Sequence, residues 1–201
     1  MILELLVLIL AYILGSIPFG VVLGKIVKSI DVRELGSGSM GMTNVIRTVG
    51  IYTGIAVLIL DMLKSILAIY LAILIVDSSL IVSLSGVLAI TGHIWPVFSK
   101  FRGGKGTACG WAGLLFLSPI SGLIASIVGL FLIAITRYVS LGSITASVVG
   151  SIFLVILCLT GNAPLPYMWF GVLGTILIAF RHKDNILRLI KGQERKLGQK
   201  I

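Results

Sequence analysis

The chain has 201 residues, of which 58% are hydrophobic and only 11% are charged, whereas soluble domains carry about 25% charged residues. This composition excludes a soluble domain and predicts a polytopic membrane protein, whose length one helical bundle accounts for. The formal net charge of +9 does not indicate nucleic-acid binding, because the basic residues lie between hydrophobic segments. We therefore expect one transmembrane domain over residues 1–201.

Seven apolar segments are predicted to span the membrane as helices. The segment 107–136 could instead form one long helix, and the positive-inside rule favours two helices with a turn at Ser118–Pro119. With that turn, every Lys and Arg except Lys64 lies on one side of the membrane, and this set includes Lys200 of the tail. The fold is thus expected to be an all-α bundle with the N-terminus outside and the C-terminus in the cytoplasm. The expected spans are about 2–23, 51–76, 80–98, 107–117, 119–136, 144–159 and 167–180.

Three local features modify this simple pattern. Pro18, with glycines on either side of it, predicts a bend near the end of the first span. The segment 107–117 would be a helix of only about 17 Å, too short to cross alone. A half-length helix that starts from a glycine loop is a known way to hold an anion at membrane depth. The tail predicts an amphipathic helix on the inner leaflet, with Ile186, Leu189 and Ile190 on one face.

The loop SKFRGGKGT, residues 99–107, is basic and rich in glycine. Gly103, Gly104 and Gly106 leave backbone N–H groups without side-chain cover, and Lys105 adds an ammonium group among them. Together with the positive end of the following helix, these groups form a concavity suited to an anion. The loop therefore predicts a phosphate site, although a basic turn that grips lipid head groups has the same composition.

Three further polar clusters are expected on the same cytoplasmic side: GSGSMGMTNVIR at 36–47, RYVSLGS at 137–143 and FRHKDNILRLIKGQE at 180–194. Their convergence with the glycine loop would build one cationic site. The first cluster could also be a flexible linker, and Ser143 could be a phosphate donor or a helix N-cap. Arg47 offers a bidentate fork for a phosphate.

Other titratable residues have structural alternatives. His93 is expected to be a hydrogen-bonded structural residue rather than a base, whereas His182, with Asn185 and several cations nearby, is the better candidate. Asp61 and Lys64, three residues apart in a span, are expected to form an ion pair rather than to act directly in catalysis. Cys109 and Cys158 are expected to pack without forming a disulfide.

Several chemistries have no signature in the sequence. It contains no G-x-S-x-G nucleophile motif, no cysteine pair with zinc spacing, no His-x4-Asp motif and no carboxylate cluster for divalent metals. We expect neither a metal nor a cofactor. The groups present suit recognition of more than one phosphate.

At its polar clusters the chain resembles the bacterial acyl-phosphate:glycerol-3-phosphate acyltransferase family (PlsY). The similar stretches, in family order over nearly the whole chain, are GSIPFG, GSGSMGMTN with Arg47, LDMLK, GHIWPVFSKFRGGKGTA, RYVSLGSI and RHKDNILRLIKGQE. The resemblance implies a seven-span inner-membrane enzyme. Its expected reaction moves an acyl chain from acyl phosphate to the 1-hydroxyl of glycerol 3-phosphate, giving lysophosphatidic acid and inorganic phosphate.

The resemblance also implies which residues form the site, and Lys105, Ser143, His182 and Asn185 are expected to be its catalytic residues. Ser39 and Met42 depart from the family pattern, which has Asn and Ala there. Besides the two substrates, membrane lipid and an enzyme that produces acyl phosphate are the expected partners. By motif position the site residues are Ser37, Arg47, Lys105, Ser143, His182 and Asn185, with Gly103, Gly104 and Gly106. The donors of the first cluster add Gly38, Gly41, Thr43 and Asn44 as substrate-binding candidates.

Two other classes of protein use similar features. A transporter for a phosphorylated solute would also need cationic loops and a half-helix, but it would predict an inverted repeat, and the sequence shows no internal repeat. A structural bundle that binds anionic lipid would account for the positive face and not for the four glycine–hydroxyl–cation clusters.

Overall fold

In a computed structural model, which describes residues 1–199, the chain is built from α-helices joined by short connections. Lys200, which was expected on the basic side of the membrane, lies outside the described residues. Three short 3-10 turns are η1 (Val32–Glu34), η2 (Val97–Ser99) and η3 (Leu165–Tyr167). The helices are α1 (Ile2–Gly15), α2 (Phe19–Lys28), α3 (Met42–Thr48), α4 (Ile51–Ile75), α5 (Ser79–Ile94), α6 (Thr107–Leu117), α7 (Pro119–Thr136), α8 (Val139–Leu159), α9 (Met168–Arg181) and α10 (Lys183–Ile190).

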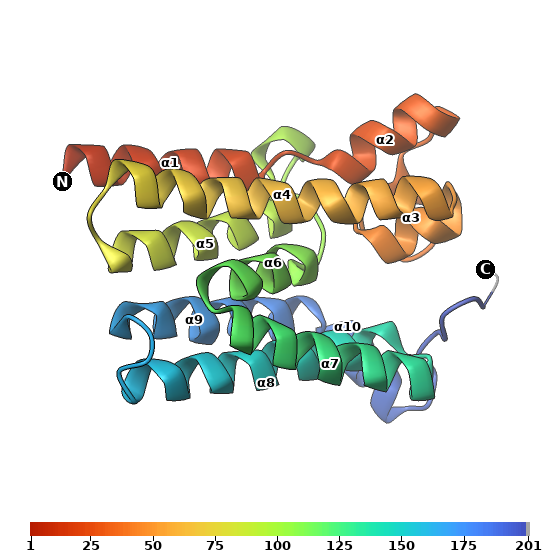
Figure 1. Cartoon of the computed structure of the whole chain (residues 1–201). Coiled ribbons are helices and arrows are strands. Elements are labelled where there is room, and N and C mark those ends of the chain that lie inside the picture. Colours follow the sequence, from red (N-terminus) through yellow and green to blue (C-terminus); the bar gives the residue numbers. More distant parts are fainter. Residues whose placement is uncertain (200–201) are drawn as a thin grey trace.

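The long helices form two packed groups with α6 between them. Helices α1, α4 and α5 pack on one another, and α7 and α9 both pack on α8. The short helix α6 contacts α4 and α5 on one side and α7, α8 and α9 on the other. In Figure 1 the N-terminus lies at one end of the bundle, while α2, α3 and α10 gather at the opposite end with the C-terminal tail. The loops that carry the polar clusters therefore meet at one end.

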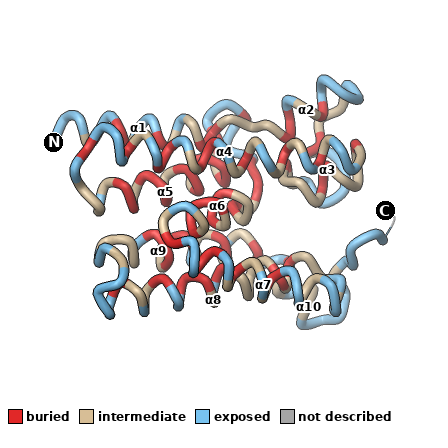
Figure 2. The backbone as a smooth tube through the Cα atoms, in the orientation of Figure 1, coloured by how far each residue is buried: buried red, intermediate tan, exposed pale blue. Residues whose placement is uncertain are grey.

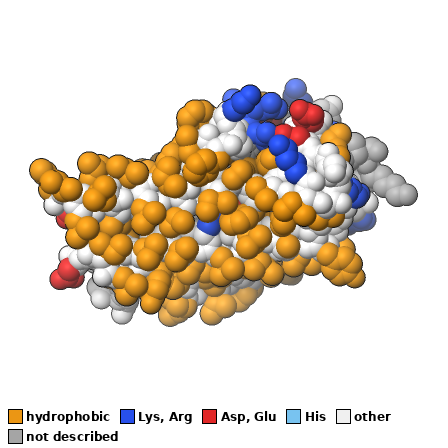
Figure 3. Space-filling view, turned by 90° about the horizontal axis from the view of Figure 1, so that it is seen from above, with side chains coloured by type: hydrophobic (Ala, Val, Ile, Leu, Met, Phe, Trp, Pro, Cys, Tyr) orange, Lys and Arg blue, Asp and Glu red, His pale blue; other side chains and the backbone are white. Residues whose placement is uncertain are grey.

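The surface and length of the helices fit a lipid environment. Five helical segments are long and apolar enough to cross a membrane: Ile2–Lys28, Ile51–Ile75, Ser79–Ser99, Pro119–Thr136 and Val139–Leu159. Two shorter apolar helices are Thr107–Leu117 and Leu165–Arg181. Buried residues lie along the contacts between helices (Figure 2), while hydrophobic side chains cover most of the face seen in Figure 3, with Lys and Arg at one end. The all-α membrane bundle is confirmed.

The break at Ser118–Pro119 is present as predicted. Pro119 is the first residue of α7, where its missing N–H costs nothing. Ser118 has φ −148° and ψ 89°, outside the helical region, as a residue before proline prefers. The hydroxyls of Ser118 and Ser121 lie 2.9 Å apart. The half-length helix α6 ends just before this break.

The first span also bends as predicted, between α1 and α2 at Pro18, but the helix continues to Lys28 and not only to residue 23. Helix α3 was not predicted, because its seven residues lie within a polar stretch. Helix α8 begins at Val139, five residues earlier than expected. Ser143 therefore lies inside α8, and its interpretation as a helix N-cap is wrong.

Candidate active site

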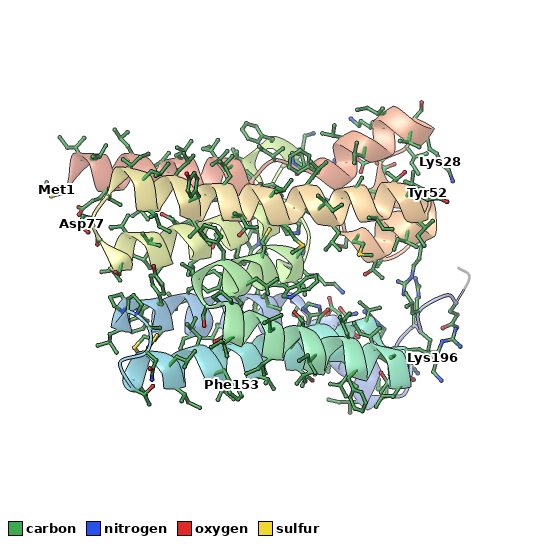
Figure 4. The ribbon with its side chains drawn as sticks, in the orientation of Figure 1. Met1, Lys28, Tyr52, Asp77, Phe153 and Lys196 are labelled. Atoms are coloured by element: carbon green, nitrogen blue, oxygen red, sulfur yellow. The ribbon has the colours of Figure 1, made fainter. Side chains whose placement is uncertain are left out.

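A cavity of about 640 Å³ opens among the polar loops and extends between α6, α7, α8 and α9. Its lining includes residues from all four polar clusters, so the structure brings together segments far apart in the sequence. Figure 4 labels Lys28, Tyr52 and Lys196 at this end of the bundle and Met1 and Asp77 at the other. The expected site residues that line it are Ser37, Gly41, Thr43, Asn44, Arg47, Lys105, Gly106, Ser143, His182 and Asn185.

Lys105 projects from the glycine loop into this cavity and contacts the C-terminal helix. Its Nζ donates a 2.6 Å hydrogen bond to Oδ1 of Asn185. Burial, with Arg188 and Arg47 nearby, lowers the Lys105 pKa to about 8, even though Glu194 opposes the shift. Gly106 then caps α6 with φ 82°, a conformation that favours glycine. Thr107 and Ala108, which carry the first N–H groups of α6, line the same cavity as Lys105.

Gly103 and Gly104 lie behind this surface and shape the loop. The N–H of Gly104 donates to the His93 carbonyl at 3.0 Å, so it already has a partner. A β-carbon on Gly104 would overlap the His93 ring, and one on Gly103 would overlap the His93 carbonyl oxygen. This corrects the expectation that the Gly104 amide is free for a phosphate. Both glycines are needed because the loop packs directly on the end of α5.

A buried carboxylate, Glu194, organises the polar side of the cavity. Its side chain is 7% exposed. Oε1 accepts hydrogen bonds from Asn185 Nδ2 at 2.6 Å and Ser140 Oγ at 2.8 Å, and Oε2 accepts from Arg188 Nε at 2.7 Å. Burial would raise the Glu194 pKa, but these three donors outweigh it and hold the pKa below its usual value. Asn185 is therefore held between Glu194 and Lys105.

Sequence reasoning named the clusters that contain Glu194, Ser140 and Arg188 but did not single out these residues. The available signal was one of the two acids in a strongly basic tail, two residues after the turn at Gly192. A carboxylate among many cations is the group expected to pair with them. Its partners on α8 and α10 become visible only in the fold.

His182 is buried at the end of α9 beside Lys105. Burial, followed by the Lys105 charge, lowers its pKa to about 4, so the imidazole is neutral near pH 7. Nδ1 lies 2.8 Å from the Ile178 carbonyl oxygen. Because that oxygen can only accept, Nδ1 carries the proton and Nε2 is left as an acceptor. His182 can therefore accept a hydrogen bond from a hydroxyl without bringing a positive charge.

Asn44 folds the loop that precedes α3. Its Nδ2 donates to the Val32, Leu35 and Ser39 carbonyls at 2.8, 3.1 and 2.8 Å, and its Oδ1 accepts the Ser37 N–H at 2.8 Å. These bonds occupy the polar atoms of its side chain, so Asn44 supports the site by shaping the loop. Gly38 is also part of this turn, with φ 70°, and lies outside the cavity lining.

Arg47 extends from α3 to the cavity, where burial and the nearby Arg195 lower its pKa. Arg33 ties this loop to the next one: its guanidinium binds both oxygens of Asp31 and donates to the Ser99 carbonyl at 2.7 Å. Hydrogen bonding to Arg33 lowers the Asp31 pKa to about 2. The segment before α3 and the glycine loop are thereby fixed relative to one another.

The predicted ion pair between Asp61 and Lys64 is present, with 2.7 Å between Nζ and Oδ1 and side chains only 2% exposed. Lys64 also donates to the Ile17 carbonyl at 2.8 Å, where α1 breaks. His93 Nδ1 lies 3.4 Å from the same Asp61 oxygen. This cluster joins α4 to the breaks that follow α1 and α5, which agrees with the structural interpretation of these residues.

The cavity changes character along its length. Cations and hydroxyls line the end formed by the loops, whereas Leu114, Ala125 and Phe170 line the other end between the helices. Such a cavity suits an amphiphile with an anionic head and an apolar tail. The fold and the site define an integral membrane protein of the multi-pass helical class, with an anion-binding cavity that continues into the bundle.

Comparisons with known proteins identify the family. The family model described as glycerol-3-phosphate acyltransferase matches residues 5–192. The chain therefore belongs to this family, the PlsY glycerol-3-phosphate acyltransferases, which are enzymes.

Relatives match the chain over nearly its full length. It is 40% identical over 208 residues to glycerol-3-phosphate acyltransferase 3 of Dehalococcoides mccartyi (strain CBDB1), covering 98% of this chain and 96% of that one. It is 43% identical over 194 residues to the Desulforamulus reducens glycerol-3-phosphate acyltransferase, with 96% and 95% covered. A crystal structure of PlsY (YgiH), an integral membrane glycerol 3-phosphate acyltransferase in its glycerol 3-phosphate form, superposes with a TM-score of 0.89 at 37% identity, covering 97% and 96%. Its lysophosphatidic acid form gives 0.87 at 36% identity, covering 97% and 95%.

Proposed function

We propose that this protein transfers an acyl chain from acyl phosphate to the 1-hydroxyl of glycerol 3-phosphate, giving 1-acyl-glycerol 3-phosphate and inorganic phosphate. The observation that carries this proposal is the single cavity that joins a cationic end to an apolar end. One substrate is a phosphorylated polyol and the other is a phosphorylated lipid. The family's name and the two PlsY structures support glycerol 3-phosphate as acceptor and lysophosphatidic acid as product.

The lack of an enzyme nucleophile fits an acyl phosphate donor. An acyl phosphate is a mixed anhydride with a good leaving group, so it needs charge neutralisation and an aligned hydroxyl. The hydroxyl oxygen attacks the acyl carbon, the bond from that carbon to the phosphate oxygen breaks, and phosphate leaves with the electron pair. The hydroxyl proton ends on the departing phosphate. No metal or cofactor is needed for this step.

The positions of the site residues support the following roles. Lys105, with the first amides of α6 after Gly106, holds one phosphate. Arg47, Ser143 and the His182–Asn185 pair hold the other and orient the hydroxyl, and Ser37, Gly41 and Thr43 also line the cavity. Asn44, Gly38, Gly103 and Gly104 act by shaping the two loops.

His182 orients the hydroxyl through Nε2. Its pKa of about 4 makes the imidazole a weak base, and a phosphate oxygen with a pKa near 6 accepts a proton more readily. The proton therefore passes to the departing phosphate, either directly or through His182.

The membrane arrangement is part of the same proposal. Five long helices and two shorter apolar ones support seven crossings, with the N-terminus outside and the C-terminus in the cytoplasm. The basic end then faces the cytoplasm of a bacterium at its inner membrane. An enzyme that makes acyl phosphate is the partner that this reaction requires. Leu130 lines the cavity and is 60% exposed, which supports entry of the acyl chain from the bilayer.

The test measures phosphate release by purified protein in detergent. With acyl phosphate present, we expect release that depends on glycerol 3-phosphate and yields lysophosphatidic acid in equal amount. With acyl-CoA as the only donor, we expect no product. Product formation from acyl-CoA, or phosphate release that is independent of glycerol 3-phosphate, would overturn the proposal.

A further inference from the structure

The apolar part of the cavity ends at a defined depth inside the bundle. On α9 the lining runs along one face through His182, Ile178 and Gly174 to Phe170. The deepest lining residue on α6 is Leu114, and on α8 it is Ser147. From His182 to Phe170 the helix rises about 18 Å, which is a little more than half of a hydrocarbon core of about 30 Å.

Phe170 closes this end of the cavity. It is 2% exposed and is among the largest fully buried side chains. A β-carbon on Gly86 would lie 2.6 Å from the Phe170 ring, and one on Gly113 would overlap it. The ring therefore occupies a slot that the two glycines leave between α5 and α6. Because the ring packs this closely on backbone from two helices, it cannot swing aside without moving one of them.

Gly174 lies one helical turn nearer the polar end, about 6 Å from the level of Phe170. The one neighbour within 4 Å of a β-carbon placed there is the terminal methyl of Ile90, at 3.1 Å. A larger side chain at Gly174 would therefore project into the cavity and shorten it. The two positions offer opposite changes in the length of the same apolar channel.

We propose that Phe170 is the floor of the acyl-binding channel and sets the longest acyl chain that the enzyme accepts efficiently, with Gly174 keeping the channel open above it. This inference rests on the proposed acyl transfer. With the head group held at Lys105 and Arg47, each added methylene moves the tail end closer to the Phe170 ring. A chain that reaches the ring would have to fold back or displace it.

The experiment measures kcat/KM for decanoyl, dodecanoyl, hexadecanoyl, octadecanoyl and eicosanoyl phosphate in one detergent. The variants are Phe170→Leu, which deepens the channel, and Gly174→Val, which shortens it. Ile176→Phe is the control, because Ile176 lies on the same helix, is 58% exposed and does not line the cavity. The ratio between two chain lengths within one variant is independent of how much protein is folded.

We expect the wild-type kcat/KM to fall beyond a limiting length. Phe170→Leu should raise the ratio of the longest to the shortest donor by about tenfold or more, and Gly174→Val should lower it by a similar factor. The control should keep the wild-type ratio.

Two results would overturn the inference. If all variants share the wild-type length profile, the tail passes through the opening near Leu130 into the surrounding detergent or lipid instead. If both core variants shift the ratio in the same direction, the channel does not end at Phe170. In either case normal wild-type turnover would leave the proposed acyl transfer standing, whereas absence of turnover with every donor would remove both.

Discussion

Lys105 and Asn185 are 80 residues apart in the chain, yet their side chains meet through a 2.6 Å hydrogen bond. The glycine loop supplies the lysine, and the C-terminal helix supplies the amide that Glu194 holds from its other side. This contact couples two of the polar clusters. If the residues around it form one site, a change at any of them should impair the same reaction.

Glu194→Gln should lower kcat/KM for glycerol 3-phosphate about tenfold. The neutral amide keeps the shape but loses the charge, and its NH2 group opposes the donors from Asn185, Ser140 or Arg188. A hydrogen bond to a charged group contributes about 1.5–3 kcal/mol. Steady-state kinetics checks this, with Glu34→Gln, an exposed carboxylate, as control. Equal activity of the two variants would contradict the organising role of Glu194.

The pH profile should report Lys105. Its pKa of about 8 means that the ammonium is charged below pH 8 and loses its proton above, so kcat/KM for glycerol 3-phosphate should decline as pH rises past 8. Lys105→Arg stays charged over this range, and its lower activity should not show the decline. A decline of the same shape in Lys105→Arg would assign it to another group.

Protonation of His182 should not lower the rate between pH 5 and pH 7, because the pKa of its imidazole is about 4. We expect His182→Asn and His182→Gln to lose activity through poorer orientation of the hydroxyl, at least tenfold. The loss should be equal at all pH values in this range. If either variant keeps the full rate across pH, the imidazole neither orients the hydroxyl nor accepts its proton.

The buried ion pair should control stability more than chemistry. Asp61→Asn leaves the Lys64 ammonium buried without its counter-charge, and removal of one partner of such a pair costs about 3–5 kcal/mol. The double variant Asp61→Asn with Lys64→Met should recover part of this loss. Denaturant unfolding in detergent measures it. Glu4→Gln, whose partner is the exposed N-terminal amine, should change stability by less than about 1 kcal/mol.

Much of this molecule could be predicted from its sequence, because a chain in lipid has few ways to hydrogen-bond its backbone N–H and C=O groups. Apolar segments long enough to cross the membrane must be helices. The distribution of basic residues favoured a break at Ser118–Pro119 over one long helix. Lys105 and His182 could be identified as site candidates because they carry chemistry that the surrounding apolar sequence does not need.

The contacts between clusters could not be predicted in the same way. Asn44 was expected to bind substrate, but its side chain is used within its own loop. Gly104 was expected to present a free amide, but it packs on His93. Glu194 was overlooked because its importance depends on donors from α8 and α10. The outcomes at Gly104 and Glu194 depend on which segments meet, and the outcome at Asn44 depends on how its own loop folds. Local composition carries little information about either.

The most direct test of one shared site compares Lys105→Ala with Lys100→Ala, an exposed lysine at the start of the same loop. The measurement is glycerol 3-phosphate-dependent phosphate release from acyl phosphate. We predict that Lys105→Ala loses ten- to a hundred-fold in kcat/KM, or about 1.4–2.7 kcal/mol of transition-state stabilisation, while Lys100→Ala stays near wild type. Near-normal turnover by Lys105→Ala would show that Lys105 does not hold a substrate phosphate and that the shared site does not exist as described.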